Sequence, residues 1–387
     1  MNHWLNRCHF GDCRDTMRRM IADGVRVQCI VTSPPYWGLR DYGVEGQIGL
    51  EQTLPEFLAQ LVEVFDLCRQ LLTDDGTLWL NMGDSYASSW GAQSREHAGK
   101  HAPNVSAISA NQVKAAQLRS TGTGSLSRTP GLKPKDLIGQ PWRLAFALQD
   151  AGWWLRQDII WSKPNPMPES VRDRCTKSHE YLFLMTRSER YFFDQDAILE
   201  PASPNTLARL AQDVANQTGS TRANGGGKTN GNMKAVGRGS SGVGFGHGYD
   251  ANPKPRSRRD SFKREDSKRE QAIPGQSVGT HRPERAESEW DVSRRNRRSV
   301  WTIPTQAYSG AHFATFPEAL VEPCVLAGSR PGDIVFDPFF GTGTTGRVAL
   351  RLGRQFIGCE LNPANSALQD DRLRGVTTGL PLEAVNA

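Results

Sequence analysis

Residues 334–360 read IVFDPFFGTGTTGRVALRLGRQFIGCE. The apolar run over 334–336 predicts a strand, and the glycine-rich segment that follows predicts a tight loop. Apolar spacing over 344–352 predicts a helix, and a second strand is expected over 356–359, directly before Glu360. A strand, a loop, a helix and a further strand in this order are typical of an α/β fold with a parallel sheet.

The loop in this stretch contains a GxGxxG pattern at Gly341, Gly343 and Gly346. Glycine allows a backbone to approach a ligand closely, and a helix N-terminus favours an electronegative group. Glu360 lies 17 residues after Gly343 at the expected end of the next strand, where a carboxylate can accept hydrogen bonds from ribose hydroxyls. The pattern predicts NAD or another adenosyl cofactor, and the alternative is a tight turn that binds nothing.

The same alternation of strands and helices extends to the rest of the chain. Predicted strands cover residues 4–10, 27–32, 77–80, 154–161 and 180–186, and predicted helices cover residues 54–72, 137–148 and 316–327. Asp74-Asp75-Gly76 is expected to end the first long helix. We therefore predict an α/β, Rossmann-like domain with a mostly parallel sheet and helices on both faces, interrupted by two polar inserts over about 88–135 and 200–300.

A second site is indicated by TSPPYW, residues 32–37, which follows the predicted strand over 27–32. Two consecutive prolines remove two backbone donors and fix an extended turn. The turn presents the Ser33 hydroxyl and a main-chain carbonyl as two acceptors beside the ring of Tyr36. Such a site suits an exocyclic amine on a flat heterocycle, which stacks on the ring while its N–H groups bind the acceptors. The alternative is a plain proline-rich turn.

Three motifs together resemble those of the amino-methylating DNA methyltransferases. TSPPYW is similar to their catalytic motif, DPFFGTGTTG (337–346) to their methionine-binding motif, and GCELNP (358–363) to their ribose-binding motif. Their order resembles the circularly permuted β group, and HFATFP (312–317) resembles a motif of cytosine-N4 members. Residues 132–197 resemble stand-alone methyltransferases of phages and prophages.

The resemblance implies a class I methyltransferase fold, S-adenosyl-L-methionine as cofactor and double-stranded DNA as substrate. It implies catalytic roles for Ser33, Pro34, Pro35 and Tyr36. It implies cofactor contacts from Asp12, Asp337, Phe339, Gly341, Gly343, Thr344, Glu360 and Asn362. In this assignment Ser33 and the Pro34 carbonyl hold the target amine, and Asp12 reads the cofactor's adenine.

The activity implied is site-specific methylation of a base flipped out of the duplex, as in enzymes of restriction–modification systems. The serine form of the catalytic motif resembles cytosine-N4 enzymes more than the Asp-Pro-Pro-Tyr adenine enzymes, although some serine-form relatives methylate adenine N6. An NAD-dependent dehydrogenase is the alternative from another class. Only the glycine pattern favours it, and it leaves SPPYW unexplained.

Positive charge is concentrated in one segment. The chain carries a formal net charge of +6, and residues 251–300 hold 14 Lys and Arg against 8 Asp and Glu, which accounts for the whole excess. Residues 219–248, which contain 11 glycines, precede this basic arm. The arm ends in Arg294, Arg295, Arg297 and Arg298. These arginines are predicted to contact DNA phosphates, and the alternative is a solvated insert that aids solubility.

The resemblance and the inserts together predict five segments. These are a catalytic half over 1–87, a flexible polar insert over 88–135, the remainder of the catalytic half over 136–199, a variable target-recognition insert over 200–300, and a cofactor-binding half over 301–387.

Several classes of protein are not expected. The seven cysteines include no CxxC pair, and the eight histidines have no metal-ligand spacing, so neither a disulfide scaffold nor a metal site is predicted. No apolar run has the length of a membrane span, and MNHWLNRCHFGD does not resemble a signal peptide. We therefore expect a protein of the cytoplasm, and the resemblance implies that it is bacterial or phage-encoded. Cys324 is interpreted as a buried helical residue rather than a nucleophile.

Overall fold

The computed structural model describes residues 3–38, 43–87, 132–133, 135–205, 293–306 and 316–376. The chain divides into two compact units, one formed by Met1–Leu199 with Asn296–Ala387 and the other by Glu200–Arg295. Most of the two predicted polar inserts, and residues 312–315 of the HFATFP motif, lie outside the described residues.

The larger unit is built on an eight-stranded sheet with the order β1-β10-β9-β2-β3-β5-β4-β8. The strands are β1 (Arg7–Phe10), β2 (Val27–Thr32), β3 (Leu72–Met82), β4 (Trp154–Ser162), β5 (His179–Thr186), β8 (Val300–Thr302), β9 (Ile334–Asp337) and β10 (Gln355–Glu360). Within this sheet β5 pairs antiparallel with β3 and β4, and the other pairings are parallel. The prediction of a mostly parallel sheet is confirmed.

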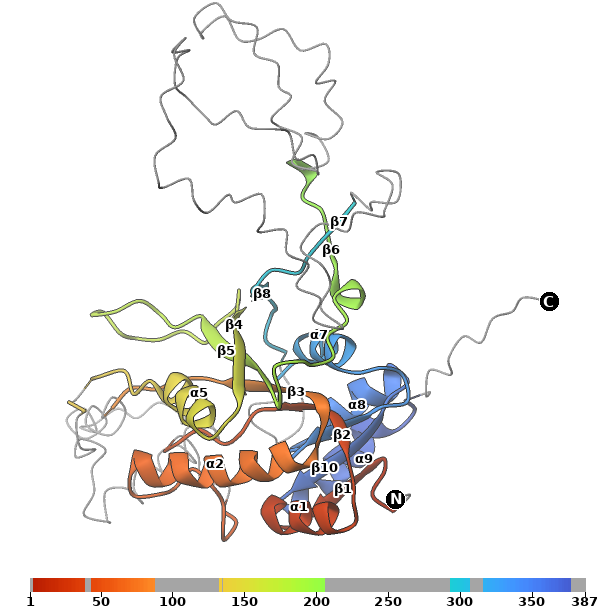
Figure 1. Cartoon of the computed structure of the whole chain (residues 1–387). Coiled ribbons are helices and arrows are strands. Elements are labelled where there is room, and N and C mark those ends of the chain that lie inside the picture. The colour runs from red at the N-terminus through yellow and green to blue at the C-terminus, as the bar shows by residue number, and fades with distance from the viewer. Residues whose placement is uncertain are drawn as a thin grey trace, which may run out of the picture. The chain divides into compact units, whose positions relative to one another are not determined.

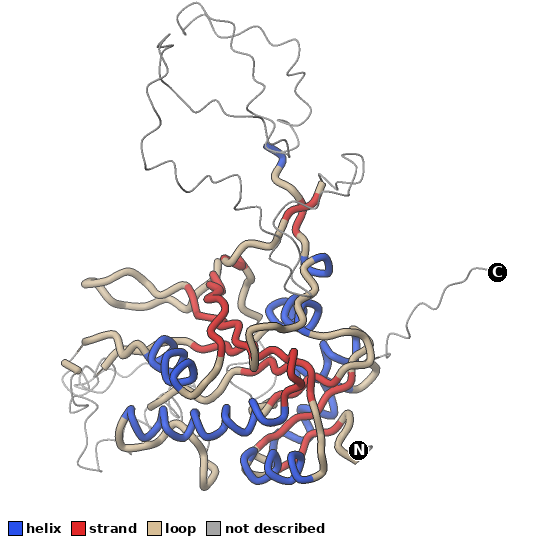
Figure 2. Tube along the Cα trace, viewed as in Figure 1, coloured by secondary structure: helices blue, strands red, loops and turns tan. Residues whose placement is uncertain are grey.

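Helices cover both faces of this sheet (Figures 1 and 2). The helices are α1 (Cys13–Ala22), α2 (Leu54–Leu71), α5 (Gln140–Asp150), α7 (Glu318–Gly328), α8 (Thr344–Arg351) and α9 (Ser366–Leu373), with short 3₁₀ turns η2 (Asp196–Ile198) and η7 (Pro363–Asn365). Residues of α1, α2 and α5 share one hydrophobic cluster with Ile30 of β2, whereas residues of α7 and α8 share a second cluster with Cys29 and Val31. Neighbouring side chains of a strand point to opposite faces, so β2 is apolar on both.

The two ends of the chain form neighbouring strands. β1 pairs in parallel with β10, with Phe10 opposite Glu360, and the Gly11 N–H donates to the Glu360 carbonyl at 2.9 Å. β10 pairs in turn with β9. The half of the sheet that carries the glycine-rich loop is therefore completed by residues from the start of the chain.

The boundary between α2 and β3 differs from its prediction. β3 begins at Leu72, and Asp74-Asp75-Gly76 lies within it at an irregularity of the register with β2. Buried Leu72 takes an extended conformation at the end of α2. The backbone after Leu72 is bound by the 187–192 segment. Ser188 Oγ donates to the Asp74 carbonyl at 2.6 Å, and the Phe192 N–H donates to the Asp75 carbonyl at 2.8 Å. The three residues therefore belong to β3, which begins at Leu72 rather than at residue 77 as predicted, while α2 ends at Leu71 before them as expected.

In the smaller unit, the described residues form a two-stranded ladder. β6 (Glu200–Pro201) pairs antiparallel with β7 (Arg294–Arg295). The Arg295 guanidinium lies 3.3 Å from the Glu200 carboxylate, and the Ala202 N–H donates to the Ser293 carbonyl at 2.7 Å. The two ends of the 200–295 segment are thus joined by backbone hydrogen bonds and by one ion pair.

Candidate active site

Polar residues follow four adjacent parallel strands at the same edge of the sheet. Asp12 follows β1, Glu360 ends β10, Asp337 ends β9, and Ser33 follows β2. Ligands of open α/β sheets bind beyond the carboxyl ends of the strands. The structure therefore brings the two sites that the sequence predicted to one edge.

The Asp337 carboxylate connects these two sites. Its side chain is buried, and Oδ1 accepts hydrogen bonds from Thr32 Oγ1 at 2.7 Å and from Phe339 N at 3.0 Å. Oδ2 accepts from Thr345 Oγ1 at 2.7 Å. Burial raises the pKa of Asp337 to about 6, although the three donors act in the opposite direction. Asp337 thus joins the residue before Ser33 to the glycine-rich loop and to the first turn of α8.

The glycines of that loop serve two different purposes. Gly343 has a φ of +86° and caps α8, a conformation that other residues rarely adopt. A Cβ on Gly346 would lie 2.6 Å from the Phe340 ring, and one on Gly358 would lie 2.4 Å from it. Phe340 stacks on Phe356 at 5.2 Å between ring centroids. Gly346 and Gly358 therefore make room for a core ring rather than for a ligand.

Glu360 supports the turn of the same loop. Its Oε2 accepts from Gly341 N–H and its Oε1 from Asn362 N–H, both at 2.8 Å. Burial raises the pKa of Glu360. A carboxylate has about four acceptor positions, so each oxygen keeps capacity for a hydroxyl donor. These two acceptor oxygens fit the vicinal hydroxyls of a ribose.

The other predicted cofactor residues have partners within the protein. Asp12 caps α1 by accepting from Arg14 N–H at 2.8 Å, and its carboxylate pairs with the Arg14 guanidinium at 2.6 Å. Burial acts to raise the pKa of Asp12, but the Arg14 bonds and charge outweigh it, and the pKa is lowered. Thr344 Oγ1 accepts from the Arg372 guanidinium, and Asn362 Oδ1 accepts from Ala364 N–H at 3.0 Å to cap η7. Phe339 is half-buried beside Asp337.

The predicted catalytic motif forms a loop directly after β2. Pro34 is buried, whereas Ser33, Pro35 and Tyr36 are half-buried. The Tyr36 hydroxyl donates to Glu180 Oε2 at 3.0 Å. Burial, and then the charge of Glu180, raises the pKa of Tyr36 well above its ordinary value, so this hydroxyl stays protonated.

Three charged residues beside this loop were not predicted from the sequence. The Glu180 carboxylate also accepts from Lys163 Nζ, which lies 4.2 Å from the centroid of the Trp161 ring. Lys177 Nζ is buried and has no hydrogen-bond partner in the described part of the chain, and burial lowers its pKa. A glutamate in the apolar strand HEYLFLMT was an available signal. The position of Glu180 beside Tyr36 depends on the antiparallel direction of β5, which brings the first residues of this strand to the edge of the sheet where the loop lies. The residues of the strand alone do not indicate that direction.

Contacts within the protein define the surroundings of Asp84 and Cys324. Asp84 accepts from the Gly139 N–H at 3.0 Å and from the Gln140 N–H at 3.1 Å, so it caps α5. The Cys324 thiol is buried in α7, donates to the Leu320 carbonyl at 3.2 Å, and has a pKa raised well above its ordinary value by burial. The interpretation of Cys324 as a buried helical residue is confirmed.

The four arginines at the end of the basic arm differ in their surroundings. Arg294 and Arg298 are exposed. Arg295 pairs with Glu200 in the smaller unit, and the Arg297 guanidinium lies 4.4 Å from the centroid of the Trp301 ring in the larger one. The rest of the arm, up to residue 292, lies outside the described residues.

In the described part of the chain, no group of three or more His, Cys, Asp or Glu side chains has the arrangement of a metal site. None of the helices described is both long and apolar enough to cross a membrane.

Comparisons with known proteins identify the family of the chain. The N6/N4 methyltransferase family, described as DNA methylase, matches residues 27–368. The chain is 42% identical over 366 residues to the type II methyltransferase M.XycI of Xanthomonas campestris pv. cyanopsidis. This match covers 94% of this chain and 86% of that protein. It is 40% identical over 371 residues to M.Cfr9I of Citrobacter freundii (96% and 88% covered) and 40% identical over 364 residues to M.SmaI of Serratia marcescens (94% and 89% covered).

We expect Glu360→Ala to weaken binding of S-adenosylmethionine by about 1–3 kcal/mol, because it removes acceptors for the ribose and the bond that holds Gly341. Isothermal titration calorimetry measures the affinity. Ser33→Ala is the control, and its cofactor affinity should equal that of the wild type. Unchanged affinity in Glu360→Ala would remove this carboxylate from the cofactor site.

The raised pKa of Asp337 predicts a specific dependence of stability on pH. The folded protein holds this proton more tightly than the unfolded chain, so the carboxyl favours folding below its unfolded pKa, and this contribution is lost as the pH rises through about 6. Relative to Asp337→Asn, which does not titrate, the wild type should lose about 2 kcal/mol of unfolding free energy between pH 4.5 and 7.5. Urea unfolding of both proteins measures the difference, and parallel pH profiles would contradict the expectation.

Proposed function

The chain belongs to the N6/N4 family of DNA methylases, and from this premise we propose that its target is cytosine and its product N4-methylcytosine. As a member of this family it is a DNA methyltransferase that uses S-adenosyl-L-methionine. The nicotinamide dehydrogenase considered on the glycine pattern alone is therefore wrong. The choice of base, and the role of each residue, are proposals.

The observation that supports methyl transfer between two neighbouring binding sites is the Thr32–Asp337–Thr345 arrangement. Thr32 Oγ1 and Thr345 Oγ1 each lie 2.7 Å from an oxygen of one carboxylate. Ser33 follows Thr32 directly, and Thr345 lies in the first turn of α8, after the glycine-rich loop. The side that would hold an amine and the side that would hold the cofactor are therefore fixed to the same buried group.

We assign the binding of the methyl donor, S-adenosylmethionine, to residues at the ends of β9, β10 and β1; this part of the site is called the donor side. Glu360 would accept from the ribose hydroxyls, and the 339–343 backbone would surround the methionine part. Asp12 would face the adenine, although its carboxylate also caps α1 and binds Arg14. When bound, S-adenosylmethionine supplies an electrophilic methyl group on its sulfonium.

On the side that binds the methyl acceptor, which is the target base, Ser33 and the Pro34 carbonyl would accept hydrogen bonds from the exocyclic amine. An aromatic amine is a poor nucleophile because its lone pair is delocalised into the ring. Acceptors outside the ring plane favour the pyramidal nitrogen, whose lone pair is available for attack, and this stabilisation acts mainly in the transition state. Tyr36 would stack on the base, with its hydroxyl held by Glu180 at 3.0 Å.

Cytosine is favoured by the neutral side chain at position 33. Serine offers a hydrogen-bond acceptor with little basicity, whereas a carboxylate at the same place would bind the amine through a stronger, charge-assisted bond. Cytosine, the smaller ring, is compatible with a short serine side chain close to Tyr36. Adenine presents an amine of the same geometry, so N6-methyladenine is the other outcome of the test.

We further propose that this is a cytoplasmic bacterial or prophage enzyme of the permuted β group, acting in a restriction–modification setting. The catalytic loop at 32–37 precedes the cofactor loop at 337–346 along the chain, which supports the permuted order. The segment between about 200 and 300 is our candidate for target recognition, and its net positive charge supports a contact with DNA phosphates.

Mass spectrometry of nucleosides from DNA treated with the enzyme identifies the product. We expect N4-methylcytosine, and N6-methyladenine without it would overturn the choice of base while leaving a DNA methyltransferase. Ser33→Ala should lower the single-turnover methylation rate by 100-fold or more, which corresponds to about 3 kcal/mol. Its affinity for S-adenosylmethionine should stay at the wild-type value.

We expect the exposed Arg294 and Arg298 to contribute more to DNA binding than Arg295, which pairs with Glu200, and Arg297, which lies over the Trp301 ring. Arg294→Ala with Arg298→Ala should reduce the log–log dependence of DNA affinity on salt by about 0.9 for each phosphate that the protein no longer neutralises. Arg295→Ala with Arg297→Ala is the matched control with the same change of charge, and it should reduce the slope less. Fluorescence anisotropy over a range of salt concentrations measures both slopes, and equal slopes for the wild type and the first variant would count against this DNA contact.

A further inference from the structure

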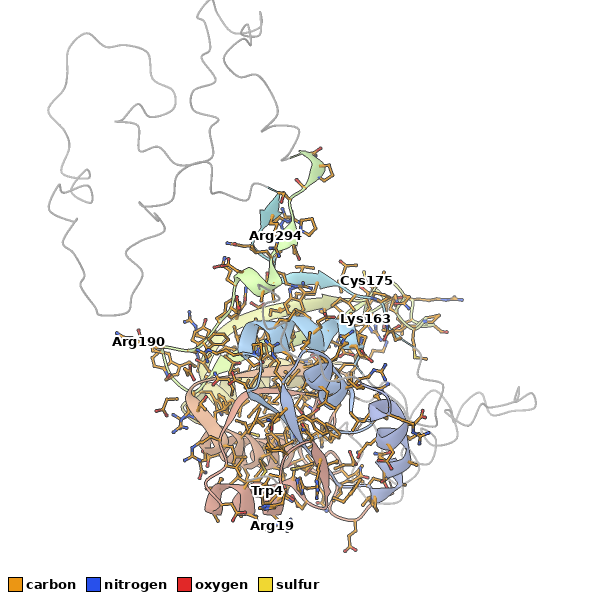
Figure 3. The ribbon with its side chains drawn as sticks, turned by 90° about the vertical axis from the view of Figure 1, so that its right-hand side faces the viewer. Trp4, Arg19, Lys163, Cys175, Arg190 and Arg294 are labelled. Carbon is orange, nitrogen blue, oxygen red and sulfur yellow. The ribbon has the colours of Figure 1, made fainter. Side chains whose placement is uncertain are left out.

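The loop between β4 and β5, residues 163–178, has no part in the chemistry assigned above beyond Lys163. Its ends lie side by side, because the Lys163 N–H donates to the Ser178 carbonyl at 2.7 Å. Tyr181 near the start of β5 lies opposite Met82 at the end of β3, so the loop leaves the sheet at the same edge as the catalytic motif. It projects away from β4 and β5 in Figure 1, and Lys163 and Cys175 mark it in Figure 3.

Met167 in this loop is 82% exposed, whereas the next most exposed large hydrophobic side chain in the described part of the chain, Val300, is 55% exposed. Single apolar residues at a surface are common and need no explanation by themselves. Met167, however, lies between two prolines, Pro166 and Pro168, which restrict the backbone on both sides. The structure therefore presents this side chain on a stiff segment.

Side-chain contacts hold the loop on both sides of Met167. Before it, Asn165 donates to the Thr305 carbonyl at 3.2 Å and accepts from the Thr305 N–H at 2.9 Å. After it, Glu169 pairs with Arg174, whose guanidinium lies 4.0 Å from the centroid of the Tyr86 ring. A loop that is ordered before it binds loses less conformational entropy on binding.

The charge of the loop suits a nucleic acid. It contains four cations and two acids, namely Lys163, Arg172, Arg174 and Lys177 against Glu169 and Asp173. Lys163 and Arg174 are paired with carboxylates and the Lys177 Nζ is buried, so Arg172 is the cation of the loop that is exposed to a DNA backbone. Arg172 is exposed, and no ion pair of it is seen within the described ranges. An exposed apolar side chain in a positively charged loop is the arrangement with which proteins insert a wedge between base pairs while cations contact the backbone.

We propose that Met167 enters the DNA duplex and fills the space that the target base leaves when it is flipped into the site. The inference rests on the proposed function, because only an enzyme that acts on a flipped base creates this space. An unbranched, polarisable methionine side chain adapts to the stacked bases above and below the gap. The loop and the catalytic motif leave the sheet at one edge, so both can face the same stretch of duplex.

The test compares duplexes that contain the methylated sequence, once sequencing of enzyme-treated DNA has identified it. In one duplex the target base is paired, and in the other it faces an abasic position, so that little pairing must be broken. We expect Met167→Ala to lower the single-turnover rate at least tenfold on the paired target and less than twofold on the unpaired target. Met167→Leu keeps an apolar wedge and should stay within threefold of the wild type on both.

Two results would overturn the wedge without affecting the methyltransferase assignment. One is an unchanged rate of Met167→Ala on the paired target, and the other is an equal loss on both targets. Phe146→Ala is a matched control, since it truncates an exposed apolar side chain on α5, and it should change neither rate. Failure of the proposed base is recognised separately, because nucleoside analysis would then give N6-methyladenine, whereas the test of the wedge compares rates on paired and unpaired targets whichever base is methylated.

A second measurement uses Cys175, the exposed one among the seven cysteines. Burial raises the pKa of the other thiols for which a shift is resolved, so an alkylating reagent at neutral pH reacts preferentially with Cys175. We expect a duplex that contains the methylated sequence to slow this alkylation at least fivefold. An unchanged alkylation rate on saturation with the duplex would show that the loop does not lie against DNA.

Discussion

The buried carboxylate of Asp337 is the group on which the arrangement of this site depends. A buried ion is unfavourable unless hydrogen bonds compensate for the water that it has lost. Asp337 receives three such bonds, from Thr32, Thr345 and the Phe339 backbone. Because β9 and β2 are neighbours in the sheet, their loops leave at adjacent points, and the carboxylate fixes the one against the other. A displacement of either loop would leave a buried charge without a partner, which gives the site a defined geometry before any ligand binds.

The same edge also joins the two ends of the chain. Glu360 ends β10 and holds Gly341 through its backbone N–H, and its own carbonyl accepts from Gly11 after β1. The donor side of the site therefore requires residues that are about 350 positions apart in the sequence. On the other side of Ser33, Tyr36 is held through Glu180, which is bound in turn by Lys163. Strands on both sides of β2 thus contribute to one site, which agrees with an enzyme that holds two substrates.

Much of this could be predicted from the sequence because the determinants are local. The strand, glycine loop and helix at 334–352, and the two prolines after β2, are recognisable in single segments, and most strands and helices follow from their periodicity. Pairings between distant segments could not be predicted in this way. Gly346 and Gly358 fit the cofactor pattern, but they make room for Phe340, which only the packed core reveals. Glu180 reaches Tyr36 because β5 is antiparallel, and Asp74-Asp75-Gly76 stays in β3 because the 187–192 segment binds its carbonyls.

A double-mutant cycle on Thr32→Val and Thr345→Val tests most directly whether one carboxylate couples the two sides of the site. Valine keeps the shape of threonine and removes its hydroxyl, so each variant deletes one hydrogen bond to Asp337. Single-turnover methylation rates are measured for the wild type, both single variants and the double variant. We expect the double variant to lose less than the product of the two single losses, with a coupling of about 0.5 kcal/mol or more. Losses that simply multiply would contradict the coupling and would mean that the two loops are held independently.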